Sequence, residues 1–258
     1  MPKVSASKTL PKTAKAKATK LVKAQAISRS KLDLFLECPR CFYLDQKLGV
    51  KRPAGPGFSL NSAVDALLKK EFDLHRAKGT VHPYAKQAGL DAVPFNHPDM
   101  EIWRNQFKRT GLRVTHEATG FEAFGYPDDI WQDRKTKELI VIEYKATAKN
   151  DEVEELDPKW HGSYKLQVAF YQWLLRMKGF KVSPTAWFLF ANGSKEPAKF
   201  DANLEFRMTM IAHEADCTWI EPSLAKVKKA LASEKAPDAD KECGFCTYRS
   251  KAAGALEN

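Results

Sequence analysis

The residues most capable of chemistry lie at the end of one apolar segment. The run LIVIEYKAT, residues 139–147, begins with four aliphatic residues, as a buried β-strand would, and then places Glu143 and Lys145 two positions apart. Because side chains alternate between the two faces of a strand, these residues share a face. Charged residues make up 29% of the chain, so a Glu-x-Lys pattern arises easily by chance. The pattern therefore suits an active site, and it equally suits a strand that ends in water.

A predicted hairpin gives Glu143 a partner of the same charge. The segment FEAFGYPDDIW (121–131) and the run above flank a polar turn, which is typical of two antiparallel strands. If the chain turns about residues 135–136, the numbers of paired residues sum to 271. That register sets Asp128 opposite Glu143 and directs Asp129 to the other face of the sheet.

Opposed carboxylates predict a bound cation. Two carboxylates facing each other across strands lie roughly 4.5–5.5 Å apart at Cβ and repel each other. In a partly buried site this repulsion is costly unless a cation lies between them, and Mg²⁺ or Mn²⁺ suits oxygen ligands. Lys145 would then activate a water or stabilise charge on a phosphate oxygen. The alternative is an ion-pair cluster of Asp128, Glu143 and Lys145 without a metal.

Three motifs in this region resemble the PD-(D/E)xK nuclease superfamily, in particular its RecB-like branch. The resemblance rests on Asp128 in GYPDD, on Glu143-Tyr144-Lys145, and on Gln167 to Tyr171, which matches Gln-x-x-x-Tyr. It implies a restriction-endonuclease-like core and a metal site formed by Asp128, Glu143 and the backbone carbonyl of Tyr144. Lys145 is implied as the catalytic lysine.

The resemblance implies roles for three more residues. Gln167 and Tyr171 lie four positions apart and so share one helix face, from which they would hydrogen-bond the DNA backbone or Lys145. Asp65 stands where the family usually has a His that supplies a further metal ligand. An unpaired carboxylate among apolar neighbours is unfavourable, so we expect Asp65 to bind the metal. The alternative is an acid on the helix surface.

Four of the five cysteines form two Cys-x-x-Cys pairs, Cys38 with Cys41 and Cys243 with Cys246. This spacing suits a metal or a cluster better than a structural disulfide, and it indicates a reducing, cytoplasmic setting. A shared site would tie the two ends of the chain together. The fifth cysteine, Cys217, is interpreted as a plain thiol.

The segment SRSKLDLFLECPRCFYL (28–44) resembles the opening of RecB-like exonucleases that contain an iron–sulfur cluster, among them the CRISPR-adaptation exonucleases. Those proteins commonly use one N-terminal and three C-terminal cysteines, whereas this chain has two at each end. The resemblance implies a 4Fe–4S cluster, ranked above structural zinc, with two unrelated reduced pairs as the third reading. Phe42, Tyr43 and Tyr248 would lie near it, where they could stack on bases or pack in the core.

The elements that must position these residues can be read from periodicity and turn signals. We expect a short helix within 28–49, a loop at 52–57, a helix from Ser59 to Gly79, an irregular segment at 80–100, a short helix at 101–110, the hairpin, a loop at 150–158, a helix over 163–178, strands over 185–193 and 204–214, and a helix over 220–234. Helices flanking a central mixed sheet give an α/β or α+β class.

Charge and composition set the remaining expectations. The net charge of +10 comes largely from seven lysines within residues 1–26, which we expect to form a disordered tail, either a nucleic-acid arm or a solvated segment, before a nuclease domain over 27–258. No apolar run approaches the ~20 residues that span a bilayer. We expect a metal-dependent exonuclease acting on DNA, with single-stranded DNA as the expected substrate, in CRISPR adaptation or DNA repair, with proteins of those systems as partners. The alternative is a DNA-binding or adaptor module that keeps the fold without activity.

Overall fold

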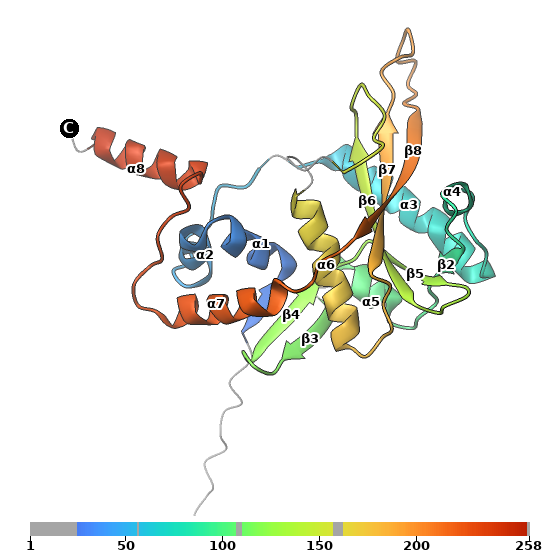
Figure 1. The fold of residues 1–258 in the computed structure, drawn as a ribbon. Helices are drawn as coiled ribbons and strands as arrows, with labels where there is room; N and C mark the ends of the chain where they lie inside the picture. The colour runs from blue at the N-terminus through green and yellow to red at the C-terminus, as the bar shows by residue number, and fades with distance from the viewer. Residues whose placement is uncertain (1–24, 56, 107–109, 157–161, 257–258) are drawn as a thin grey trace, which may run out of the picture.

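The computed structural model describes residues 25–55, 57–106, 110–156 and 162–256 (Figure 1). The tail expected over residues 1–26 falls outside the described residues except for its last two, and Ala26 already begins a strand. The elements are, in order, β1 (Ala26–Ser28), α1 (Arg29–Glu37), α2 (Pro39–Gln46), α3 (Ser59–Lys78), α4 (Pro83–Gln87), β2 (Ala92–Pro94), α5 (Met100–Arg104), β3 (Leu112–His116), β4 (Phe121–Gly125), β5 (Asp129–Asp133), β6 (Leu139–Thr147), α6 (Gly162–Met177), β7 (Thr185–Gly193), β8 (Phe206–Glu214), α7 (Ile220–Ala232) and α8 (Gly244–Leu256).

The described strands form two mixed sheets. The larger has the order β2-β5-β6-β7-β8, with β6 and β7 parallel and the other neighbours antiparallel. The smaller has the order β1-β4-β3, with β1 parallel to β4. The expected class, a mixed sheet flanked by helices, is confirmed, although the strands divide into two sheets.

The larger sheet is buried on both faces, because successive residues of β6 enter different cores. Ile142 belongs to a cluster that includes Phe72 of α3. Val141 points the other way, into the core that Leu174 of α6 helps to fill. Figure 1 shows α3 and α6 on opposite sides of this sheet. By the same alternation, Glu143 faces α6.

The predicted hairpin register is confirmed, since Asp129 pairs with Ile142. The strand expected over 121–131 is wrong in its extent, because β4 joins the smaller sheet and only β5 pairs with β6. The break contains Pro127, whose nitrogen cannot donate to a strand ladder. Asp128 therefore stands at the entrance to β5 rather than inside a strand.

Other differences from the expected elements also have local causes. The helix expected within 28–49 is two helices, because Cys38 is extended (φ −160°, ψ 105°) before Pro39, which opens α2. The segment expected to be irregular, 80–100, contains α4 and β2. Pro83 occupies the first turn of α4, and Pro94 lies on the edge strand β2, and both positions tolerate proline.

The C-terminal part of the chain packs against the N-terminal helices. Helix α7 follows the sheet and packs against α1 and α2. Helix α8, which the sequence analysis did not predict, begins within the second cysteine pair, directly after Cys243 (Figure 1). Within the part of the chain that is described, no helix combines the length and the apolar character that crossing a membrane requires.

Candidate active site

The hairpin brings Asp128 and Glu143 to the same end of the larger sheet. Glu143 lies on β6, and Asp128 immediately precedes β5. The backbone amide of Tyr144 donates to Asp128 Oδ2 over 2.9 Å, which fixes the Asp128 carboxylate beside β6. The confirmed register thus places the two carboxylates where the sequence predicted them.

Glu143 is buried, with 2% of its surface exposed, yet only one of its two carboxylate oxygens is satisfied. Oε1 accepts hydrogen bonds from Lys145 Nζ and from Gln167 Nε2, each over 2.6 Å. Oε2 is buried and has no hydrogen-bond partner among the described residues. A buried carboxylate oxygen without a donor is unfavourable, and a divalent cation would satisfy it. The donor set therefore fits a hard metal ion.

Lys145 is held by three neighbours. Its Nζ donates to Glu143 Oε1 and lies 3.3 Å from Gln167 Oε1. The ammonium also lies 4.4 Å from the centre of the Tyr164 ring, a cation–π distance. These contacts fix a long, flexible side chain at the mouth of the site.

Gln167 and Tyr171 share a face of α6, as their spacing predicted. Gln167 Nε2 also lies 3.2 Å from the Tyr171 hydroxyl, so Gln167 connects Tyr171 to Glu143 and Lys145. The sequence allowed a hydrogen bond either to the DNA backbone or to Lys145, and the structure shows the contact between Gln167 and Lys145. Tyr171 approaches β4 closely at Gly125, where a Cβ atom would lie 2.4 Å from the ring. Any other residue at position 125 would displace that ring.

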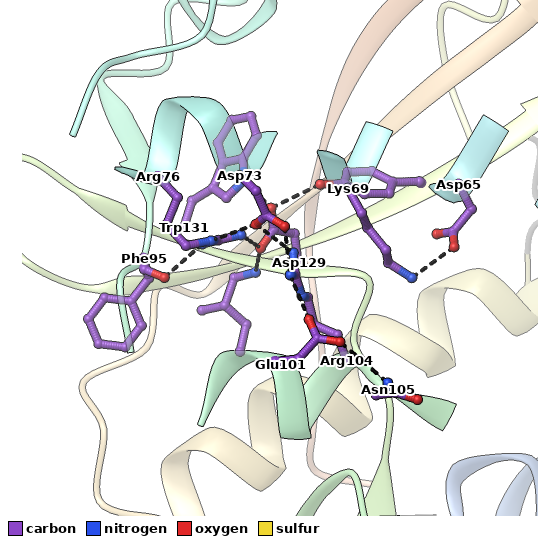
Figure 2. A network of polar contacts seen from close by, with 12 residues as sticks. Asp65, Lys69, Asp73, Arg76, Phe95, Glu101, Arg104, Asn105, Asp129 and Trp131 are labelled. Carbon is purple, nitrogen blue, oxygen red and sulfur yellow. Dashed lines mark hydrogen bonds and ion pairs between the residues drawn. The ribbon is translucent and has the colours of Figure 1, made fainter. Parts of the chain in front are cut away.

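Asp65 reaches the site from α3, which lies on the opposite side of the sheet from α6. Its Oδ2 accepts a hydrogen bond from Lys69 Nζ over 2.9 Å (Figure 2). The same ammonium lies 3.5 Å from Asp128 Oδ1. Lys69 thus bridges two of the three carboxylates that the sequence assigned to a metal.

The electrostatic field at these carboxylates favours a cation. Burial, followed by the charge of Glu143, raises the pKa of Asp128 to about 7. Burial and the charge of Asp128 also raise the pKa of Asp65. Burial would lower the pKa of Lys69, but Asp128 and Asp65 outweigh it and raise that pKa. Proton, ammonium and metal ion are therefore alternative ways of offsetting the same negative charge.

Asp129, whose side chain the register places on the other face of the sheet, is held there by several polar contacts (Figure 2). It is fully buried. Its carboxylate accepts hydrogen bonds from Arg76 Nη2 (2.6 Å), Trp131 Nε1 (3.1 Å), the Tyr144 hydroxyl (2.9 Å) and the amide of Ile130 (2.8 Å). The hydrogen bond from Arg76 of α3 to Asp129 holds α3 against the sheet. Asp128 is not among these partners and remains available to the site.

A cleft of about 700 Å³ opens over the site and gives it room for a polymer substrate. Its lining includes Asp65, Lys69, Asp128, Tyr144 and Lys145. Glu143 is buried below the surface of this cleft, behind the lining residues. Asp65, Asp128 and Lys145, three of the residues assigned to the chemistry, therefore border one open cavity.

The four paired cysteines meet at a second location. All four are buried, and their Sγ atoms lie within 4.8 Å of one another, so the two chain ends do come together. Of the aromatic residues expected near them, Phe42 and Tyr43 are buried and cannot stack on bases. Tyr248 is 76% exposed. The lone Cys217 accepts a hydrogen bond from Arg176 and stands apart from the cluster.

Two residues of the active site were missed by the sequence analysis. Lys69 follows Asp65 by four positions, the spacing of a helical ion pair, and that spacing was the available signal. Gly125 opens the GYPDD motif, but only the folded structure shows that Tyr171 crosses it.

Comparison with known proteins identifies the family. The model of the PD-(D/E)XK nuclease superfamily matches residues 26–251, so the chain belongs to this superfamily. No curated protein matches the chain. Among solved structures, it is similar to a candidate exonuclease from Eubacterium rectale (16% identity, 87% of this chain and 88% of that one, TM-score 0.39) and to SSO0001 (15% identity, 89% and 86%, TM-score 0.35). Both TM-scores are low, so the assignment rests on the family model.

Proposed function

We propose that this chain is a divalent-metal-dependent exonuclease that hydrolyses phosphodiester bonds in single-stranded DNA. The observation that carries the proposal is Glu143 Oε2, a buried carboxylate oxygen without a donor among the described residues, beside Asp128 and below an open cleft. Membership of a nuclease superfamily supplies the reaction class. The choice of single-stranded DNA and of end-directed cleavage follows the RecB-like motifs.

Each residue has a distinct part in the proposed reaction. Asp65, Asp128, Glu143 and the Tyr144 carbonyl would hold Mg²⁺ or Mn²⁺, which supplies a polarised phosphate and a more acidic water. Lys145 would orient the attacking water and offset charge on the phosphate oxygens. Gln167, bonded to both Lys145 and Glu143, would position the lysine, and Tyr171 would position Gln167.

A nuclease assay with matched substrates tests the proposal. We expect the full-length protein to degrade linear single-stranded DNA with Mn²⁺, to spare a circular form of the same strand, and to lose activity with EDTA. Glu143→Gln, which keeps the shape but loses the charge, should abolish cleavage. Glu117→Gln, at an exposed turn residue, is the control. Cleavage of the circle would overturn the exonuclease assignment, and activity that survives EDTA or Glu143→Gln would overturn the metal site.

A second candidate function, a DNA-binding module with weak or no catalysis, is favoured by one observation. Lys69 lies 2.9 Å from Asp65 and 3.5 Å from Asp128, where a metal ion would bind. DNA binding without cleavage under any divalent ion would support this function. For the nuclease, CRISPR adaptation and DNA repair are the two proposed roles, and the genes beside this one would separate the two pathways.

Lys69 should compete with the metal ion. We expect Lys69→Met to bind Mn²⁺ about tenfold more tightly than wild type, roughly 1.4 kcal/mol, because the ammonium no longer neutralises Asp65 and Asp128. Calorimetric titration with Mn²⁺ in the absence of DNA measures this directly. Lys70→Met, at the exposed neighbouring lysine, should leave the affinity unchanged. Equal affinities in all three proteins would contradict the competition.

A further inference from the structure

The four clustered cysteines lie at the starts of two helices. Cys38 occupies the N-cap position of α2, and Cys41 lies in its first turn. Cys243 precedes α8, and Cys246 lies in its first turn. Helix N-termini carry partial positive charge, which stabilises thiolates. The same arrangement at both ends of the chain directs four sulfur atoms at one point.

The distances between these sulfur atoms match the ligands of a single ion. Cys38 and Cys246 Sγ lie 3.8 Å apart, Cys41 and Cys243 Sγ 3.6 Å, and Cys41 and Cys246 Sγ 3.5 Å. A tetrahedral zinc ion with Zn–S bonds of about 2.3 Å holds its sulfur ligands about 3.8 Å apart. These separations far exceed the ~2.05 Å of a disulfide bond, and all four cysteines are free.

The 4Fe–4S cluster that the sequence motifs imply does not fit this arrangement. Such a cluster attaches each cysteine to a different iron, so its four Sγ atoms surround a body of eight atoms. Here all four Sγ atoms lie within 4.8 Å of one another, which leaves space for one ion only.

Charge near the sulfur atoms is also arranged for an anionic metal–thiolate group. Four thiolates and Zn²⁺ leave a net charge of −2, which needs compensation in a buried site. Arg52 Nη2 donates to Cys243 Sγ over 3.5 Å, and its guanidinium stacks on Phe245, 4.4 Å from the ring centre. Glu37 Oε1 fixes the same guanidinium at 2.6 Å. The amide of Asp240 donates to Cys38 Sγ over 3.5 Å. Arg52 is thus a positioning residue for the thiolates.

We propose that Cys38, Cys41, Cys243 and Cys246 bind one structural zinc ion and that Arg52 stabilises the zinc–thiolate group. The ion fastens α8 and the C-terminal segment to the N-terminal helices. This inference is independent of the proposed nuclease chemistry, because the carboxylate site and the cysteine site share no residue.

Elemental analysis of the full-length protein, purified without oxygen, tests the metal. We expect about one zinc per chain and a colourless protein, and Co²⁺ supplied in place of zinc should give the visible bands of a tetrahedral thiolate site. Cys246→Ser should lose the bound zinc or fail to fold, whereas Cys217→Ser, the matched control, should keep it. About four irons per chain with visible charge-transfer absorption, or no bound metal, would overturn the proposal.

Competition with a chromophoric chelator tests Arg52. Changing an outer-shell partner typically weakens metal affinity 10–100-fold, so we expect Arg52→Gln to release zinc at a correspondingly lower chelator concentration. Arg52→Lys, which keeps the charge, should recover part of the affinity. Circular dichroism before the titration shows that each variant is folded. Equal zinc retention in wild type and Arg52→Gln would contradict the role of Arg52.

Discussion

Replacing Lys145 with alanine should lower the rate of DNA hydrolysis about 10²–10⁴-fold, the usual contribution of a positioned proton-transfer group. Lys145 is the ammonium that borders the cleft and contacts Glu143, so its removal leaves an attacking water without its partner. The metal ligands stay in place, and Mn²⁺ should therefore still bind. Single-turnover degradation of linear single-stranded DNA, together with Mn²⁺ titration, measures both effects.

A neighbouring lysine supplies the control for that experiment. Lys149 is exposed just beyond the end of β6, and Lys149→Ala removes the same charge from the same region without touching Glu143. We expect near-normal cleavage by this variant. If Lys145→Ala and Lys149→Ala cleave DNA equally well, the role given to Lys145 is wrong.

The sequence predicted the central strand pair because the evidence for it is local. Alternation along 139–147 and the polar turn before it determine which residues of β6 face α6, and the register followed by counting. Gln167 and Tyr171 were paired by the same reasoning, since helical spacing alone puts them on one face. These predictions succeeded because the residues they relate are close in sequence as well as in space.

Prediction failed for several other contacts between distant segments, although it did bring the two cysteine pairs together. The segment 121–131 reads as one strand, yet β4 pairs with β1 and β3 while β5 pairs with β2 and β6. Pro127 marks the break, but which sheet each half joins depends on strands distant in the sequence. The Lys69–Asp128 contact joins α3 to the entrance of β5. Phe42 and Tyr43 are apolar and aromatic in either role, so only their burial against the returning C-terminal segment shows that they belong to the core.

The adjacent residues Asp128 and Asp129 have different roles, Asp128 in the proposed metal site and Asp129 in the stability of the fold. Asp129→Asn should destabilise the fold by about 3 kcal/mol, the lower end of the cost of breaking a buried ion pair. The lower end applies because Arg76 keeps Asp73 and the Phe95 carbonyl as partners. Denaturant unfolding should show this loss with or without metal.

Asp128→Asn should have the opposite effect in metal-free protein. The pKa of Asp128 is raised from 3.8 to about 7, first by burial and then by Glu143, so the folded state binds a proton that the unfolded state releases. Wild-type stability should therefore fall as pH rises from about 4 to about 7, and stay lower above that range. The Asn variant lacks this carboxylate, so it should exceed wild type in stability at pH 8 and match it near pH 4.

Metal ions should reverse that order. Mn²⁺ binds only the folded carboxylate site and stabilises it by mass action, so at pH 8 saturating Mn²⁺ should raise the melting temperature of wild type more than that of Asp128→Asn. In the same Mn²⁺ titration, the melting temperature of Asp129→Asn should start below that of wild type and rise as much as that of wild type. Equal melting temperatures of wild type and Asp128→Asn at every pH, with and without Mn²⁺, would show that Asp128 is not the strained carboxylate that the metal relieves.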